Sequence, residues 1–339
     1  MGVKRKIKKS ADADEMLLTD AFEHFINEKE ALGKSPATLR SYRGSFGQFN
    51  KLVCTEDDLC KDIDSNRIYR WINIMKQDDI KVASINHYLR DIRTFLNWCM
   101  DAKREFITEP FKINMVDGQE ESIKLFTDDE IHILLEAPHR TADFAEYRMW
   151  VIIQWVLATG NRASTICNIK MQDIDFKVKE VQLKHTKNKK ATKAIPLSSE
   201  IISVIKEYIR KFRKTAAPED YLFANVGDEQ LSTNALRLSL ERYCKSRGVF
   251  KEGLNKHGER IGKSNIHGLR HNYAKGYVLS NGSMFKLQQM LGHSTLDMTR
   301  KYVNLFNQDL HHEHDAHTPL DNFKKGKSRR KQIYNTDKV

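Results

Sequence analysis

Six polar side chains in the second half of the chain are of types that could together cleave a phosphodiester. They are Arg162, Lys187, His267, Arg270, His293 and Tyr302. A tyrosine hydroxyl can attack phosphorus and conserve the bond energy in a covalent phosphotyrosine, which allows resealing without an energy source. Two guanidinium groups, always protonated and able to donate in a planar fork, suit the negative charge that builds on the non-bridging oxygens. Arg162 and Arg270 are the candidates for this role.

The other candidates would move protons or contact the leaving group. Tyrosine has an unperturbed pKa of about 10, so Tyr302 needs help in losing its proton. His267 is a candidate base or hydrogen-bond partner, and His293 a candidate contact to the phosphate or the leaving group. The departing oxygen needs a proton donor, and a lysine at a hairpin tip, such as Lys187, is suited to this role.

Taken alone, each of these residues also has a purely structural interpretation. Tyr302 falls on a helical stripe with Met298 and Leu305, at spacing i, i+4, i+7, and tyrosines on such stripes mostly pack in a core. His293 follows Gly292 and could simply end a helix. The chemical hypothesis therefore depends on the whole set and on its order along the chain.

As an ordered set, these residues resemble the tyrosine recombinase family, also called the phage integrase family. The specific motifs are HGLRHNYA, residues 267–274, and LQQMLGHSTLDMTRKYV, residues 287–303, in which Leu-Gly-His precedes a tyrosine by nine residues. The helical first half is similar to the family's core-binding domain in ATLRSYRGSFGQF and SINHYLRDIRTFLNW. The resemblance covers residues 16–306.

The resemblance implies a site-specific DNA recombinase that works through a 3′-phosphotyrosine, in integration, excision or resolution of a mobile element. It further implies paired recombination half-sites in duplex DNA, a tetramer on the synapsed DNA, and no metal or other cofactor. Two features differ from the usual pattern. Thr165 stands where an acidic residue usually follows Arg-x-Ser, and the hairpin is one residue longer, so Lys184, Lys189 and Lys190 remain alternatives to Lys187.

Hydrophobic periodicity predicts a mainly α-helical chain with two domains. We expect a helical, SAM-like core-binding bundle over residues 16–103, a linker over 104–124, and a mostly helical catalytic domain with a small β-hairpin over 125–306. Residues 1–15 form a basic arm that we expect to be disordered. Residues 307–339 form a tail that we expect to contact a neighbouring subunit.

Residues at the predicted element boundaries support this division. Thr19 is the predicted N-cap of the first helix, and Gly33 follows its end. Ser35 before Pro36 predicts the start of the second helix. Alternating apolar residues on both sides of a lysine-rich turn predict a β-hairpin over residues 179–197.

Two predicted helices of the first half carry polar flanks that could follow a DNA backbone. The residues are Arg40, Arg43 and Lys51 on the second helix, and Asn86, Arg90 and Arg93 on the fourth. The formal charge of +12 also favours a polyanionic partner, nucleic acid rather than membrane. One such flank is typical of any solvated helix, whereas two in one small unit favour phosphate contacts.

Several classes of protein are disfavoured by composition. No apolar run reaches the roughly 18 residues of a membrane span, and the basic N-terminus lacks the apolar stretch of a secretory signal. The five cysteines are odd in number and form no Cys-x-x-Cys pair, so neither a disulfide framework nor a zinc site is predicted. We expect a cytoplasmic protein, associated with the nucleoid of a prokaryotic host.

Three other functions were weighed against recombination. A type IB topoisomerase shares the Arg-Lys-Arg-His-Tyr chemistry, but the integrase-like helical first half favours recombination. A DNA-binding module without catalysis would not need Tyr302 or Lys187. A metal-dependent nuclease would need convergent carboxylates, and acidic pairs such as Asp128 and Asp129 fall at helix starts, where acids are common for other reasons.

Overall fold

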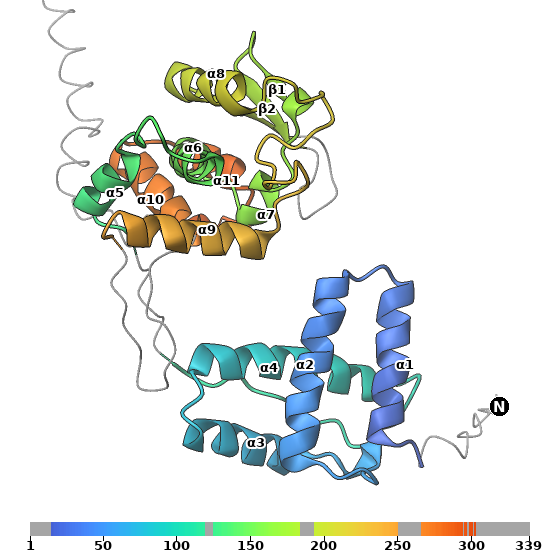
Figure 1. Cartoon of the computed structure of the whole chain (residues 1–339). Coiled ribbons are helices and arrows are strands. Elements are labelled where there is room, and N and C mark those ends of the chain that lie inside the picture. Colours follow the sequence, from blue (N-terminus) through green and yellow to red (C-terminus); the bar gives the residue numbers. More distant parts are fainter. Residues whose placement is uncertain are drawn as a thin grey trace, which may run out of the picture. The chain divides into compact units, whose positions relative to one another are not determined.

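The chain divides into two compact units, residues 1–121 and 122–339, shown in Figure 1. The structure is a computed structural model, and it describes residues 15–118, 125–183, 193–249, 266–293, 295, 296, 298–300 and 302. Within these residues each unit has a hydrophobic core of its own. The secondary structure is mainly helical with one small three-stranded sheet, which agrees with the predicted fold class.

The first unit is a bundle of helices packed around aromatic side chains. Its helices are α1 (Leu18–Ala31), α2 (Pro36–Val53), α3 (Ser65–Gln77) and α4 (Val82–Cys99), with a short 3-10 turn at Cys60–Asp62. Phe22 stacks on Phe46, with ring centroids 3.8 Å apart, and meets Phe95 edge-on at 5.2 Å. Since these rings come from α1, α2 and α4, they fix three helices around one apolar centre.

The helix boundaries in this unit test the local predictions. Gly33 adopts a left-handed conformation (φ +75°) just beyond α1, and the Ser35 hydroxyl accepts a hydrogen bond from the Thr38 amide at 3.2 Å, as predicted. The prediction for Thr19 is wrong, because α1 begins at Leu18 and its N-cap is Leu17, two residues earlier than predicted. The amide of Leu18 donates to the carbonyl of Asp58 at 2.9 Å. A backbone carbonyl from a distant loop therefore binds an amide of the first helical turn, as a side-chain cap would otherwise do.

The chain after α4 packs onto the core of the first unit. Ile107 and Ile113 are buried there. The Asn86 side chain on α4 binds Val116 through two hydrogen bonds of 2.8 Å, one to the carbonyl oxygen and one from the amide nitrogen. Much of the segment between the two cores therefore belongs to the first unit.

The second unit is built around α6. Its helices are α5 (Asp128–Leu135), α6 (Phe144–Thr159), α7 (Ala163–Ile166), α8 (Ser199–Phe212), α9 (Thr233–Ser246), α10 (Ile266–Leu279) and α11 (Met284–Leu291). In Figure 1, α6 lies in the middle of this unit, where it contacts α5, α8, α9 and α10. Three consecutive residues, Val151, Ile152 and Ile153, are fully buried, so α6 is covered on all sides.

A three-stranded antiparallel sheet completes the unit. It consists of β1 (Ile174–Asp175), β2 (Glu180–Leu183) and β3 (Lys193–Pro196), which follow a short 3-10 turn at Met171–Asp173. Val181 lies opposite Ile195, and both are buried. The predicted hairpin is thus confirmed. Its tip, which contains Lys187 and the three alternative lysines, lies outside the described residues.

Gly160 provides a test of how α6 ends. Its φ of +63° is left-handed, and a Cβ there would lie 2.4 Å from the Tyr273 ring and 2.8 Å from Leu291. We expect Gly160→Ala to lower the free energy of unfolding of the second unit by at least about 2 kcal/mol, because backbone strain and overpacking add. Scanning calorimetry would measure this change.

The matched control is Gly44→Ala in the middle of α2, where a new Cβ meets no atom within 4 Å. Alanine favours a helix interior over glycine by up to about 1 kcal/mol, so this variant should be as stable as the parent or slightly more stable. Equal stability of the two alanine variants would contradict the argument.

Candidate active site

Arg270 is the centre of the site. It lies on α10, is only 2% exposed, and donates to the Gly160 carbonyl at 2.6 Å and to the Leu291 carbonyl at 2.8 Å. Both acceptors are carbonyls at helix C-termini, which have no partner within their own helix and carry partial negative charge. The guanidinium group therefore ties the ends of α6 and α11 to α10.

His293 is held on the other side of Arg270. Its Nε2 atom lies 3.0 Å from Arg270 Nη2, and its Nδ1 atom lies 2.9 Å from the hydroxyl of Thr299, which is fully buried. A guanidinium group can only donate, so Nε2 of His293 accepts and, in the neutral ring, Nδ1 donates to Thr299. The ring orientation and tautomer of His293 follow from these two contacts.

Tyr302 lies against these residues. It is 4% exposed, and its ring is parallel to that of His293, with centroids 6.2 Å apart. Burial raises the pKa of the phenol, while the charges of Arg270 and Arg162 and a hydrogen bond from Arg270 oppose this change. The hydroxyl is thus protonated at neutral pH, but its surroundings favour a phenolate as soon as the proton has a destination.

Arg162 comes from the chain just after α6. Its Nη2 donates to the Gly292 carbonyl at 3.2 Å, next to the carbonyl that holds Arg270. Burial and the charge of Arg162 lower the pKa of Arg270 to about 10, so Arg270 remains charged at pH 7. Two cations held together in this way suit an anion, because a phosphate between them would relieve their repulsion.

His267 lies in the first turn of α10, and part of its side chain reaches solvent. Partial burial and then the charges of Arg270 and Arg162 lower its pKa, so the imidazole is neutral at pH 7. Its ring meets that of His271 edge-on, with centroids 4.7 Å apart.

His271 is the site residue that the sequence analysis missed. Its Nδ1 atom lies 2.8 Å from the Tyr302 hydroxyl, the direct contact we had assigned to His267. The available signal was spacing, because residues four apart share one face of a helix. His267 was the predicted contact because it matches the His-x-x-Arg motif.

The predicted packing stripe around Tyr302 is partly wrong. Met298 is 44% exposed, whereas Thr299 is fully buried. Thr299 turns inward because its hydroxyl binds His293. Leu305, the last residue of the predicted stripe, lies outside the described residues.

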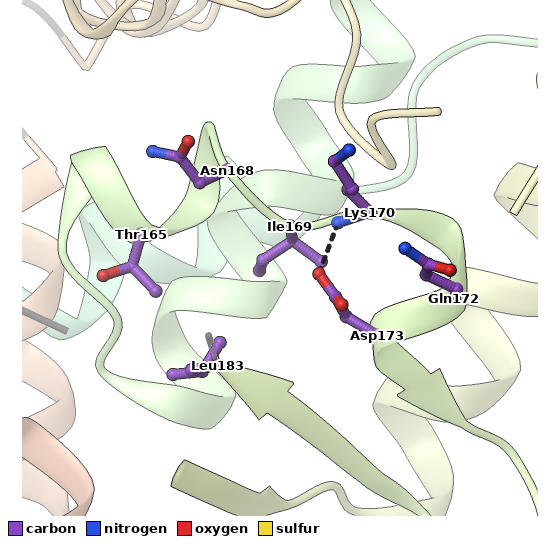
Figure 2. A pocket seen from close by; sticks show the side chains of 7 residues that line it. All are labelled: Thr165, Asn168, Ile169, Lys170, Gln172, Asp173 and Leu183. Atoms are coloured by element: carbon purple, nitrogen blue, oxygen red, sulfur yellow. Dashed lines mark hydrogen bonds between the residues drawn. The ribbon is translucent and has the colours of Figure 1, made fainter. Parts of the chain in front are cut away.

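Thr165, which stands at the position usually held by an acid, faces a small pocket of about 150 Å³ at the root of the hairpin, shown in Figure 2. The pocket is lined by Thr165, Asn168, Ile169, Lys170, Gln172, Asp173 and Leu183. The Asp173 carboxylate accepts a hydrogen bond from the Lys170 amide at 2.9 Å. Arg162 is held by the Gly292 carbonyl, so its position does not depend on an acidic residue at 165.

The candidate DNA-binding residues of the first unit differ in their surroundings. Arg40, Lys51 and Arg90 are exposed, and Arg93 is half-buried. Arg43 binds Glu23 at 2.6 Å, and this contact raises its pKa. The Asn86 amide is occupied by Val116, so its contribution to this unit is structural.

The flanks of α2 and α4 are joined directly. The hydroxyls of Ser41 and Ser45 on α2 both donate to the Asp91 carboxylate on α4, at 2.6 and 2.8 Å. This contact holds the two helices in a fixed relation, and Arg40 and Arg90 are each next in sequence to one of its residues, Ser41 and Asp91.

A buried phenol beside Arg270, His271 and His293 is an arrangement suited to phosphoryl-transfer chemistry. Residues 124–309 match the model of the phage integrase family. Tyrosine recombinase XerC of Staphylococcus aureus (strain MSSA476) is 26% identical over 292 residues, which cover 85% of this chain and 93% of XerC. The chain belongs to the phage integrase family of tyrosine recombinases, and it is a DNA strand transferase.

Solved structures share the fold. A lambda integrase dimer bound to a core site aligns with a TM-score of 0.64 and 19% identity, covering 86% of this chain and 78% of that chain. The integrase of transposon Tn1549, in complex with transposon right end DNA, aligns with a TM-score of 0.67 and 17% identity, covering 85% and 94%. These likenesses confirm the mainly helical, two-domain fold class.

Thr299 tests how His293 is positioned. Thr299→Val preserves shape but leaves the Nδ1 proton of His293 without its acceptor, so we expect a loss of about 1–3 kcal/mol in the free energy of unfolding of the second unit. Denaturant titration of both proteins would measure it. Thr299→Ser, which retains the hydroxyl, is the control. If the valine variant proved as stable as the serine variant, this hydrogen bond would not hold His293.

Proposed function

We propose that Tyr302 attacks a DNA phosphodiester to form a 3′-phosphotyrosine, and that the protein thereby acts as a site-specific recombinase. The observation that carries this proposal is the burial of the Tyr302 hydroxyl beside Arg270 and His293. A covalent intermediate conserves the bond energy, so strands can be rejoined without a nucleotide or metal cofactor.

The remaining roles are proposed from the chemistry of these residues and, for Lys187, from the resemblance to the family. Arg162 and Arg270 bind the non-bridging oxygens of the phosphate and stabilise the charge of the transition state. His293, aligned by Arg270 and Thr299, contacts the phosphate or the leaving group. His267 stands at the rim of the site as a contact to the DNA. Lys187 on the hairpin tip donates a proton to the 5′ oxygen, with Lys184, Lys189 and Lys190 as alternatives.

We propose that the first unit binds the DNA backbone. The exposed side chains Arg40, Lys51 and Arg90 lie on the joined flanks of α2 and α4. The net charge of +12 favours a polyanion. DNA is also the partner named for the structural relatives, lambda integrase and the Tn1549 integrase.

We propose that the working assembly is a tetramer on two synapsed duplexes. Lambda integrase has been solved as a dimer on a core site and as a tetramer on a Holliday junction. Residues 307–339, the predicted subunit contact, lie outside the described residues. A cytoplasmic location remains a prediction.

The family match favours recombination over the alternatives, a type IB topoisomerase and a DNA-binding module without catalysis. Integration, excision and resolution remain open, because the relatives include both XerC recombinases and integrases. Inverted half-sites or mobile-element neighbours beside the gene would distinguish them.

Tyr302→Phe tests the nucleophile. With a nicked duplex that carries inverted half-sites from the DNA beside the gene, we expect the parent to form a denaturant-resistant adduct in the presence of a chelator. The variant should form none, because phenylalanine has no hydroxyl, and it should still bind the duplex. Gel electrophoresis under denaturing conditions would measure the adduct.

Tyr277→Phe is the matched control, since Tyr277 packs in the same small cluster as Tyr302. It should form the adduct at the parental rate. An adduct that survived Tyr302→Phe, or one that required magnesium, would rule out the proposed mechanism. Relaxation of supercoiled plasmids without such sites, and no recombination of paired sites, would favour the topoisomerase.

The basic flanks of α2 and α4 are tested by the double variant Arg40→Ala, Arg90→Ala. Each lost phosphate contact should reduce the slope of log affinity against log salt by about 0.9, so the total change is about 2. The control, Arg70→Ala with Lys76→Ala, removes the same charge from exposed positions on α3. Equal salt slopes for the two variants would argue against this surface as the DNA contact.

A further inference from the structure

One direct partner of the Tyr302 hydroxyl is a histidine outside the six residues with assigned roles. The Nδ1 atom of His271 lies 2.8 Å from Tyr302 Oη, and the two ring centroids are 5.5 Å apart. His271 is half-buried on α10, directly after Arg270. The inference below rests on the proposed role of Tyr302 as nucleophile.

The direction of this hydrogen bond follows from the other partners. Arg270 has donors only, so its hydrogen bond to Tyr302 uses a lone pair of the phenol oxygen. The phenol's own proton is then available to His271. Burial, followed by the charges of His267 and Arg270, lowers the pKa of His271 to about 4, so the ring is neutral at pH 7 and can accept this proton at Nδ1.

The other two histidines of the site are less suited to this task. In His293, one ring nitrogen accepts from Arg270 and the other donates to Thr299, so both ring nitrogens are engaged. His267 meets the His271 ring edge-on and extends toward solvent. Geometry therefore favours His271 as the group that removes the phenolic proton.

We propose that His271 is a catalytic residue that accepts the proton of Tyr302 during cleavage and returns it during resealing. In cleavage, the bond between Tyr302 Oη and phosphorus forms and the bond between phosphorus and the 5′ oxygen breaks. The phenolic proton moves to His271 Nδ1, while the 5′ oxygen takes a proton from the hairpin lysine. In resealing, the 5′ hydroxyl attacks and each proton moves back.

Substrate binding makes His271 a better base. In the free protein, positive charge on Arg270 disfavours the imidazolium form. A bound phosphodiester brings negative charge to Arg162 and Arg270 and offsets part of this effect, so the pKa of His271 rises when the substrate is in place. The acceptor is thus neutral before DNA binds and is strengthened when the nucleophile must act.

The test measures the rate of adduct formation on the nicked duplex for the parent, His271→Ala and His271→Asn. Asparagine can accept a hydrogen bond near the Nδ1 position but cannot hold the proton. Because positioned acid-base groups contribute on the order of 10² to 10⁴ in rate, we expect both variants to lose at least about 100-fold. Affinity for the duplex should change by less than about threefold. His132→Asn, at an exposed position on α5, is the control.

A second substrate separates the nucleophile from the leaving group. In a duplex with a bridging sulfur at the 5′ position, the leaving thiolate needs no proton, so Lys187→Ala or the corresponding variant of an alternative lysine should recover its rate. His271 variants should remain slow. Added imidazole should partly restore His271→Ala by filling the space left by the side chain.

The outcomes are distinct. A parental rate for His271→Asn would overturn the inference and leave His271 as a positioning residue. Recovery of the His271 variants on the sulfur substrate would also overturn it, since His271 would then act on the leaving group. If the parent itself formed no adduct, the proposed function would fail instead. Thermal unfolding of both variants shows whether a slow rate reflects loss of the fold.

Discussion

The structure of the second unit depends on one buried cation. Arg270 is almost inaccessible to solvent, and burying an unpaired guanidinium group would cost several kcal/mol. The carbonyls of Gly160 and Leu291 and the Nε2 atom of His293 compensate for the lost hydration. Because these acceptors lie at the C-terminal ends of α6 and α11 and Arg270 lies on α10, the charge can be buried only when all three helices are in place.

The same interaction positions Tyr302, the proposed nucleophile. Arg270 orients His293, His293 binds Thr299, and Thr299 is one turn before Tyr302, so the phenol segment is held against α10. Burial of Tyr302 keeps its hydroxyl protonated, whereas the two arginines favour the phenolate. Opposing effects of this kind allow a nucleophile to remain inactive in the free protein and to become reactive once its proton is removed.

The sequence predicted a helix boundary correctly where residues at that boundary set it. Ser35 caps α2 through its own hydroxyl, and Gly160 ends α6 because its backbone is left-handed. Thr19 and Met298 were assigned wrongly for one common reason. A tertiary contact replaced the local one: the Asp58 carbonyl satisfies the start of α1, and the His293 ring turns Thr299 inward in place of Met298.

For the site, the sequence by itself indicated the candidate residue types and their order: Arg162, the hairpin lysines, His267, Arg270, His293 and Tyr302. Those types follow from the chemistry of phosphate, which needs fixed cations and a hydroxyl, and this requirement is visible without coordinates. Only the tertiary structure decided which histidine touches the phenol. His267 and His271 share one face of α10, so helical periodicity cannot separate them, and the packing of the Tyr302 segment selects His271.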